Sequence, residues 1–103
     1  MSFGQIIVEA RKRARISQKE LATRIKKEDG TKISPQYLND IERDRRNPPS
    51  EYLINQLAKE LNLAKEYLIL AAGTLPSEIQ VKLTDSDPKL VVRAFRVFRK
   101  NIK

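Results

Sequence analysis

Apolar residues recur at intervals of three and four along most of this chain, a spacing that gathers them on one face of an α-helix. The pattern predicts a chain built from helices. They are expected over residues 3–14, for about two turns from Gln18, from Pro35 onward, over 51–62, over 64–72, from 75–77 to Leu83, and over 88–100.

The inward positions of the first five helices supply a small hydrophobic core. Predicted core residues are Phe3, Ile7, Ala10 or Ala14, Leu21, Ala22, Ile25, Leu38, Ile41, Leu53, Leu57, Ala58 and Leu61 with Ile54 flanking, then Tyr67, Leu68 and Ala71.

Helix start signals agree with this division of the chain. Ser17 and Glu20 have the spacing of a capping box, in which each side chain bonds the other residue's backbone N–H. Further caps are predicted at Ser34, where Pro35 takes the first helical position, at Ser50, and at Asp87 before Pro88, while Gly73 marks a helix end.

The stretch Ile33–Asn47, ISPQYLNDIERDRRN, combines a core-facing side with an outward polar side. Glutamine and asparagine can form paired hydrogen bonds with adenine, aspartate can accept from the cytosine amino group, and tyrosine can meet a thymine methyl or a phosphate. The outward residues that supply these groups are Gln36, Tyr37, Asn39 and Asp40. The short helix is therefore a candidate reader of DNA bases.

Basic residues follow this helix closely. Arg43, Arg45 and Arg46 precede Asn47, and arginines that contact phosphates fix the register of a protein on DNA while carrying little sequence information. The whole chain has a net charge of +8 and a pI near 10.0, which favours a polyanionic partner. Seven basic and three acidic residues lie after residue 75.

Composition narrows the function classes. The chain has no cysteine and no histidine, which excludes thiol chemistry, serine–histidine triads and the usual zinc sites. We therefore expect neither an enzyme nor a metal or other cofactor. No apolar run reaches the length of a membrane span, and the lack of cysteine fits a cytoplasmic protein.

Two segments together resemble the Cro-like and lambda-repressor-like helix-turn-helix family. They are FGQIIVEARKRARISQKELATRI and ISPQYLNDIERDRRNPPSEYLINQLAKELNL, and the resemblance covers roughly residues 3–72. It implies a compact five-helix domain whose second and third helices bind DNA, the third in the major groove. It also implies that Gln18 contacts phosphate and braces the third helix, and that Arg11 and Glu42 form an internal ion pair.

The residues expected to contact double-stranded DNA come from both helices and the loops around them. They are Gln18, Lys19, Lys32, Ser34, Gln36, Tyr37, Asn39, Asp40, Arg43, Arg45, Arg46 and Asn47.

The sequence departs from the family pattern in three places. About six extra residues, mostly within 26–32, lengthen the turn between the second and third helices; this loop could touch DNA or displace the third helix. Asp44 replaces a common glycine and puts a negative charge among the arginines. Pro35 removes one base contact that some relatives make.

Residues 1–73 are predicted to form the DNA-binding domain and 74–103 a helical extension. The amphipathic helix at 88–100 could pack on the domain, pair with a second chain, or lie on an anionic membrane; we expect a homodimer and no membrane. The expected function is a sequence-specific transcriptional regulator, a repressor dimer on an operator. The alternative is an antitoxin-like module that binds a protein partner, with DNA binding secondary.

Overall fold

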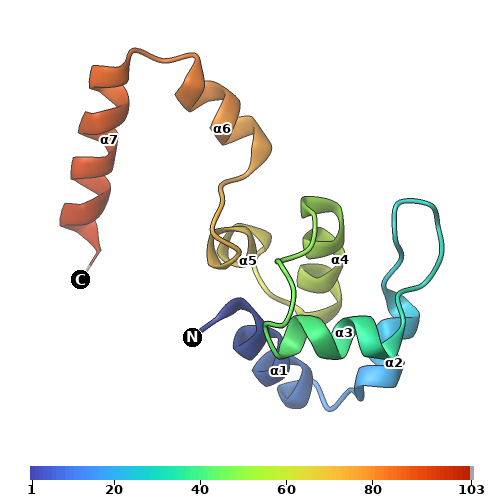
Figure 1. Cartoon of the computed structure of the whole chain (residues 1–103). Coiled ribbons are helices and arrows are strands. Elements are labelled where there is room, and N and C mark those ends of the chain that lie inside the picture. Colours follow the sequence, from blue (N-terminus) through green and yellow to red (C-terminus); the bar gives the residue numbers. More distant parts are fainter. Residues whose placement is uncertain (103) are drawn as a thin grey trace.

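Seven α-helices make up the regular structure of residues 1–102, the part of the chain that the computed structural model describes. They are α1 (Phe3–Arg13), α2 (Gln18–Arg24), α3 (Pro35–Glu42), α4 (Glu51–Leu61), α5 (Lys65–Ala71), α6 (Ser77–Thr84) and α7 (Pro88–Asn101) (Figure 1). The predicted all-α class is confirmed. Lys103, the end of the predicted extension, lies outside the described residues.

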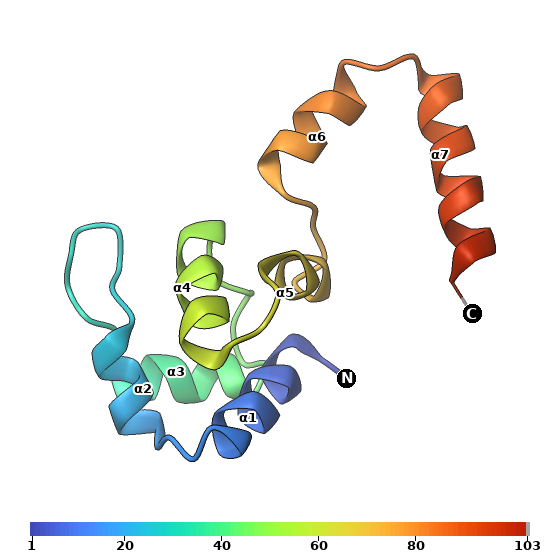
Figure 2. The same cartoon turned by 180° about the vertical axis from the view of Figure 1, so that it is seen from behind.

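The hydrophobic core joins α1 to α5. Each of these helices contributes a fully buried side chain, namely Ile7, Leu21, Leu38, Leu57 and Leu68. Helix α3 packs against both α1 and α2, and α4 packs against α1 and α5. One side of α3 is thus held by two helices, while its other side is left to solvent (Figures 1 and 2).

The predicted caps are present. Side chains of Ser17, Ser34, Ser50 and Asp87 each accept a hydrogen bond from a backbone N–H in the following turn. The prediction of a reciprocal capping box at Ser17 was wrong. The Glu20 carboxylate instead accepts from Arg24, 2.6 Å away, because an oppositely charged side chain four residues on competes for it.

The core differs from the prediction mainly in α5. Tyr67 is half exposed, whereas Ile69 is buried beside Leu68. Two adjacent residues of a helix are both buried only when the buried side of the helix is centred between them. With Leu68 and Ile69 both buried, Tyr67 lies on the opposite side of α5. In α1 the choice between Ala10 and Ala14 falls to Ala10, since Ala14 is exposed.

Helices α1 and α3 approach each other most closely at Gly4. A Cβ atom there would lie 2.4 Å from the Glu42 carbonyl oxygen and 2.6 Å from that of Ile41. The Asp44 carboxylate caps the start of α1. It accepts from the Gly4 N–H at 2.9 Å and from the Ser2 hydroxyl at 2.5 Å. Glycine at this position lets the backbones meet without a side chain between them.

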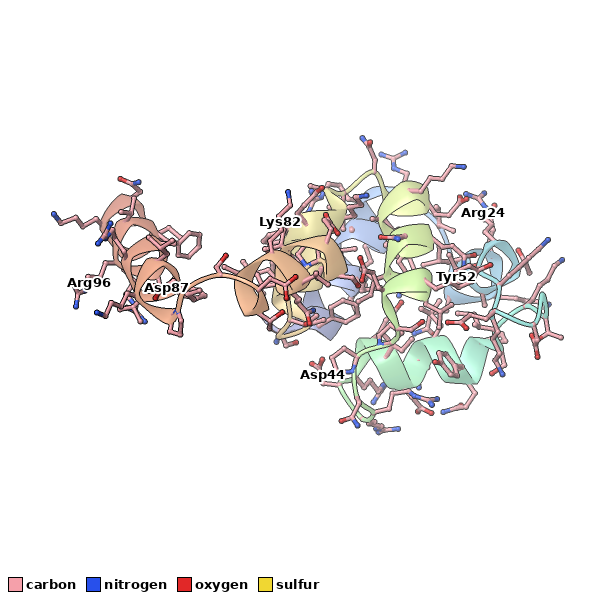
Figure 3. All side chains as sticks on the ribbon, turned by 90° about the horizontal axis from the view of Figure 1, so that it is seen from above. Arg24, Asp44, Tyr52, Lys82, Asp87 and Arg96 are labelled. Carbon is pink, nitrogen blue, oxygen red and sulfur yellow. The ribbon has the colours of Figure 1, made fainter. Side chains whose placement is uncertain are left out.

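Asp44 adopts the left-handed conformation, with φ of 56°, that a glycine would take at low cost. Aspartate tolerates this region better than most residues. Asp44 lies at the end of α3 (Figure 3), and its carboxylate bonds to the Gly4 N–H at the start of α1. The expected negative charge on the basic loop is therefore partly satisfied inside the fold.

Helices α6 and α7 stand away from the five-helix domain (Figures 1 and 2). Neither contains a buried residue. Packing of the last helix onto the domain, one of the three expectations, is therefore not the arrangement of this structure.

We predict that Gly4→Ala destabilises the fold by about 1–3 kcal/mol, because the added methyl group overlaps two carbonyl oxygens of α3. Urea unfolding measures the change. Asn55→Ala, at an exposed position of α4, is the control and should not lower stability. A Gly4→Ala protein as stable as the parent would show that α1 and α3 do not meet as described.

Candidate nucleic-acid interface

The outer side of α3 carries hydrogen-bonding side chains that are not buried in the core. Gln36 is exposed, and Tyr37, Asn39 and Asp40 are half-buried. The Gln36 amide nitrogen donates to the Asp40 carboxylate at 3.0 Å. This bond uses one of the two amide hydrogens, so Gln36 keeps its carbonyl oxygen and one N–H for a further partner.

A buried ion pair fixes the inner side of α3. Arg11 donates to both oxygens of the Glu42 carboxylate, at 2.7 and 3.0 Å, and also to the Ile16 carbonyl oxygen at 3.0 Å. The side chains of Arg11 and Glu42 are only 13% and 3% exposed. This bidentate pair connects α1, the turn before α2 and the end of α3, so the predicted internal pair is confirmed.

Gln18 extends this connection to α2. Its amide nitrogen donates to Glu42 at 2.8 Å and to the Asn39 side-chain oxygen at 3.1 Å. Gln18 therefore braces α3, as the resemblance implies. Both amide hydrogens are engaged within the protein, and the phosphate contact of Gln18 stays a prediction.

The loop after α3 presents its basic residues to solvent. Arg43, Arg45, Arg46 and Asn47 are all exposed. The Arg46 guanidinium lies 3.9 Å from the centre of the Tyr37 ring, within the range of a cation–π contact. Tyr37 thus holds one arginine of the loop beside the outer side of α3. An open polar hollow of about 570 Å³ is lined by Tyr37 together with Arg45, Arg46 and Asn47.

The long turn between α2 and α3 is pinned at its base. Lys26 and Lys32 pair as an isolated antiparallel bridge, and the Ile33 N–H donates to the Ile25 carbonyl oxygen at 3.0 Å. The Gln56 side chain of α4 both accepts from the Lys26 N–H and donates to its carbonyl oxygen, at 2.8 and 2.7 Å. The extra residues therefore project outward from a closed base.

The tip of this turn is ordered by local bonds. Asp29 accepts from the Thr31 hydroxyl and the Thr31 backbone N–H, and these bonds lower the pKa of the Asp29 carboxyl. Gly30 has a φ of 88°, which only glycine adopts readily. The Lys27 ammonium lies 5.6 Å from the Tyr37 ring centre, so this side chain reaches from the turn to α3.

The remaining candidate residues lie in α2, in the long turn and at the start of α3. Lys19 and Lys32 are exposed. The Ser34 hydroxyl accepts from the Tyr37 N–H at 3.0 Å, which leaves its own hydrogen free to donate. Contact of any of these residues with DNA stays a prediction.

Sequence patterns missed two residues that shape this site. Gly4 lets α1 reach α3, and Gln56 closes the long turn. A glycine inside a helical pattern is a usable signal of close packing. A polar side chain that bonds backbone thirty residues away leaves no such trace.

Two features are absent from residues 1–102. No group of three or more acidic side chains lies close enough to hold a metal ion. No helix within this range combines the length and apolar character needed to cross a membrane.

We predict that Glu42→Ala destabilises the protein by about 3 kcal/mol, because Arg11 is left as an unpaired charge with little access to water. Urea unfolding gives the value. Glu20→Ala breaks the exposed pair with Arg24 and should cost under about 1 kcal/mol. Equal losses in the two variants would contradict a structural role for the buried pair.

The comparisons with known proteins agree with this geometry. The family described as Helix-turn-helix matches residues 7–68, which include α2, α3, the turn between them and the basic loop. No curated protein and no solved structure matches the chain. The matched segment covers more than half of the chain. The chain therefore belongs to the Cro-like and lambda-repressor-like helix-turn-helix family of DNA-binding transcription regulators.

Proposed function

We propose that this protein is a sequence-specific repressor that inserts α3 into the major groove of an operator as a dimer. The observation that carries the proposal is the two-sided nature of α3. Its inner side is locked by the Arg11–Glu42 pair, while its outer side offers unsatisfied amide groups beside exposed arginines. A rigid, pre-positioned helix loses little freedom on binding.

Base reading falls first to Gln36. It is exposed, and after its bond to Asp40 it retains one N–H and a carbonyl oxygen, the two groups that pair with adenine. Arg43 and Arg45 would contact phosphates and set the register of α3. Repression would then follow from occupancy of the operator, without catalysis. Because the operator would lie on the chromosome, we expect the repressor to act in the cytoplasm.

Residues 1–73 are proposed as the DNA-binding domain and 74–103 as the dimerisation element. Leu90, Phe95 and Phe98 of α7 and Ile79 of α6 are each at least 40% exposed. An apolar hollow of about 300 Å³ opens between α5, α6 and α7. Its lining residues are Leu70, Leu75, Ile79, Leu83, Ala94, Phe95 and Phe98.

A second copy of this chain suits this apolar surface because the basic residues of α7 lie elsewhere on the helix. Arg93, Arg96 and Lys89 line a separate hollow with Pro88 and Val92, and Arg96 is seen on the outer side of α7 in Figure 3. Two copies could therefore meet through their aromatic residues with the cations left in water. Symmetric pairing also matches the two-fold half-sites that such dimers bind.

The antitoxin-like alternative uses the same surface. An exposed apolar face of this kind also suits a different protein chain. The two functions differ in the oligomeric state of the purified protein, since a module that waits for another partner stays monomeric.

We predict that selection from random duplex DNA returns a defined operator, and that Gln36→Ala weakens binding to it by about 1–3 kcal/mol with little change for nonspecific DNA. Arg45→Ala should weaken both kinds of binding and reduce the salt dependence. Titrations at two salt concentrations separate these effects. An unchanged operator preference in Gln36→Ala would contradict the assigned reading face.

We predict that a Phe95→Asp and Phe98→Asp double variant sediments as a monomer, because a carboxylate in an apolar contact loses its hydration. Lys100→Asp, also exposed on α7, is the matched control and should remain a dimer. Helical content by circular dichroism should stay close to that of the parent. A parent protein that is monomeric at all concentrations would favour the antitoxin-like alternative.

A further inference from the structure

We propose that the long turn between α2 and α3 belongs to the DNA interface through Lys27, which Tyr37 holds together with Arg46 as a pair of phosphate-binding cations. In this arrangement Tyr37 positions the two cations at the border of α3 and does not read a base. The proposal deepens the proposed function and rests on it, because it assumes that α3 lies in the major groove.

The place of Tyr37 around α3 separates it from the centre of the outer side. Successive residues of a helix are turned by about 100°, so Gln36 and Asp40 lie together in the middle of the side opposite the buried residues, and their side chains bond at 3.0 Å. Asn39 lies at one border, where a side chain of α2 bonds to it. Tyr37 lies at the other border, away from α2.

Two cations from different parts of the chain lie against the Tyr37 ring. The Arg46 guanidinium is 3.9 Å from the ring centre and the Lys27 ammonium is 5.6 Å from it. Both distances are within the range in which an aromatic ring attracts a cation. Arg46 belongs to the loop after α3 and Lys27 to the long turn before it, so the ring brings these two basic segments together.

Neither cation forms an ion pair with a carboxylate within residues 1–102. The Asp29 carboxylate, which lies in the same turn as Lys27, is bonded to Thr31. Both charges lie close to one ring, and they are separated by less than about 10 Å, the distance over which 0.1 M salt screens charges. Lys27 and Arg46 therefore repel each other in the free protein, and an anion bound beside both would offset this repulsion.

A phosphate of the DNA backbone suits this position. The major groove is bounded by two phosphate strands, so a helix that lies in it has one strand along each border. The polar hollow beside Tyr37 adds the exposed side chains of Arg45 and Asn47 to the same border. Because phosphate contacts carry little sequence information, Lys27 would add affinity for DNA and leave the choice of bases to the middle of α3.

Titration of the full chain against its selected operator and against random duplex DNA, each over a salt series, tests the role of Lys27. Lys27→Gln should weaken both kinds of binding by a similar factor of about three to ten, and it should lower the slope of log affinity against log salt by about one, as for one lost phosphate contact. Lys65→Gln, the matched control, removes the same charge from an exposed position of α5 and should leave the slope unchanged. An unchanged slope in Lys27→Gln, or an equal fall in Lys65→Gln, overturns the proposal.

Two variants of Tyr37 test whether its ring positions the cations. Tyr37→Phe keeps the ring and should retain both the salt slope and the selected sequence of the parent. Tyr37→Leu lacks the ring, so it should weaken binding to operator and random duplex alike without changing the selected bases. A changed base preference in Tyr37→Phe, or parental affinity and slope in Tyr37→Leu, overturns the proposal. Urea unfolding checks that each variant is folded, since Tyr37 also packs against the core.

Failure of the proposed function gives different results. A parent protein that binds no duplex DNA overturns both proposals. A parent that binds duplex DNA without selecting an operator contradicts only the sequence-specific repressor, and the salt slopes of the Lys27 and Tyr37 variants are then measured on random duplex. An operator that is lost in Gln36→Ala, together with a parental slope in Lys27→Gln, contradicts only the role of the long turn.

Discussion

The buried ion pair between Arg11 and Glu42 is the constraint on which the position of α3 depends. Two charges removed from water are unfavourable unless every donor and acceptor is used. Here the carboxylate receives two hydrogen bonds from Arg11 and one from Gln18, and no buried side-chain polar atom within residues 1–102 lacks a partner. Satisfying Glu42 therefore requires α1, α2 and α3 to occupy one relative position.

The contact between α1 and α3 continues this constraint along the helix. Gly4 brings the start of α1 against the last carbonyl groups of α3, and Asp44 then closes the start of α1. Asp44, which has a positive φ, therefore has two roles: it turns the chain at the end of α3, and its side chain caps α1. The arginines that follow leave α3 from a fixed point, which suits residues that set the register on DNA.

The sequence predicts what is local and misses what depends on tertiary contacts. Caps at Ser34 and Ser50 follow from neighbouring residues, and the structure has them. Tyr67 was misplaced because the buried stripe of α5 is decided by α4, and periodicity over so short a helix fits more than one stripe. The bond from Gln18 to Asn39 spans 21 residues and depends on Glu42 lying between them, which spacing alone does not reveal.

The long turn between α2 and α3 illustrates how an insertion can leave a binding site in place. Ile25 and Ile33 are both buried and joined by a backbone bond, so the chain enters and leaves the insertion at one fixed point. Closing a somewhat longer loop adds only about 0.6 kcal/mol for each doubling of its length. Gln56 holds Lys26 from α4, so the added residues extend away from the α2–α3 contact instead of separating the helices. The position of α3 is thus set by Glu42, Leu38 and Ile33, and the insertion leaves the contact between α2 and α3 in place.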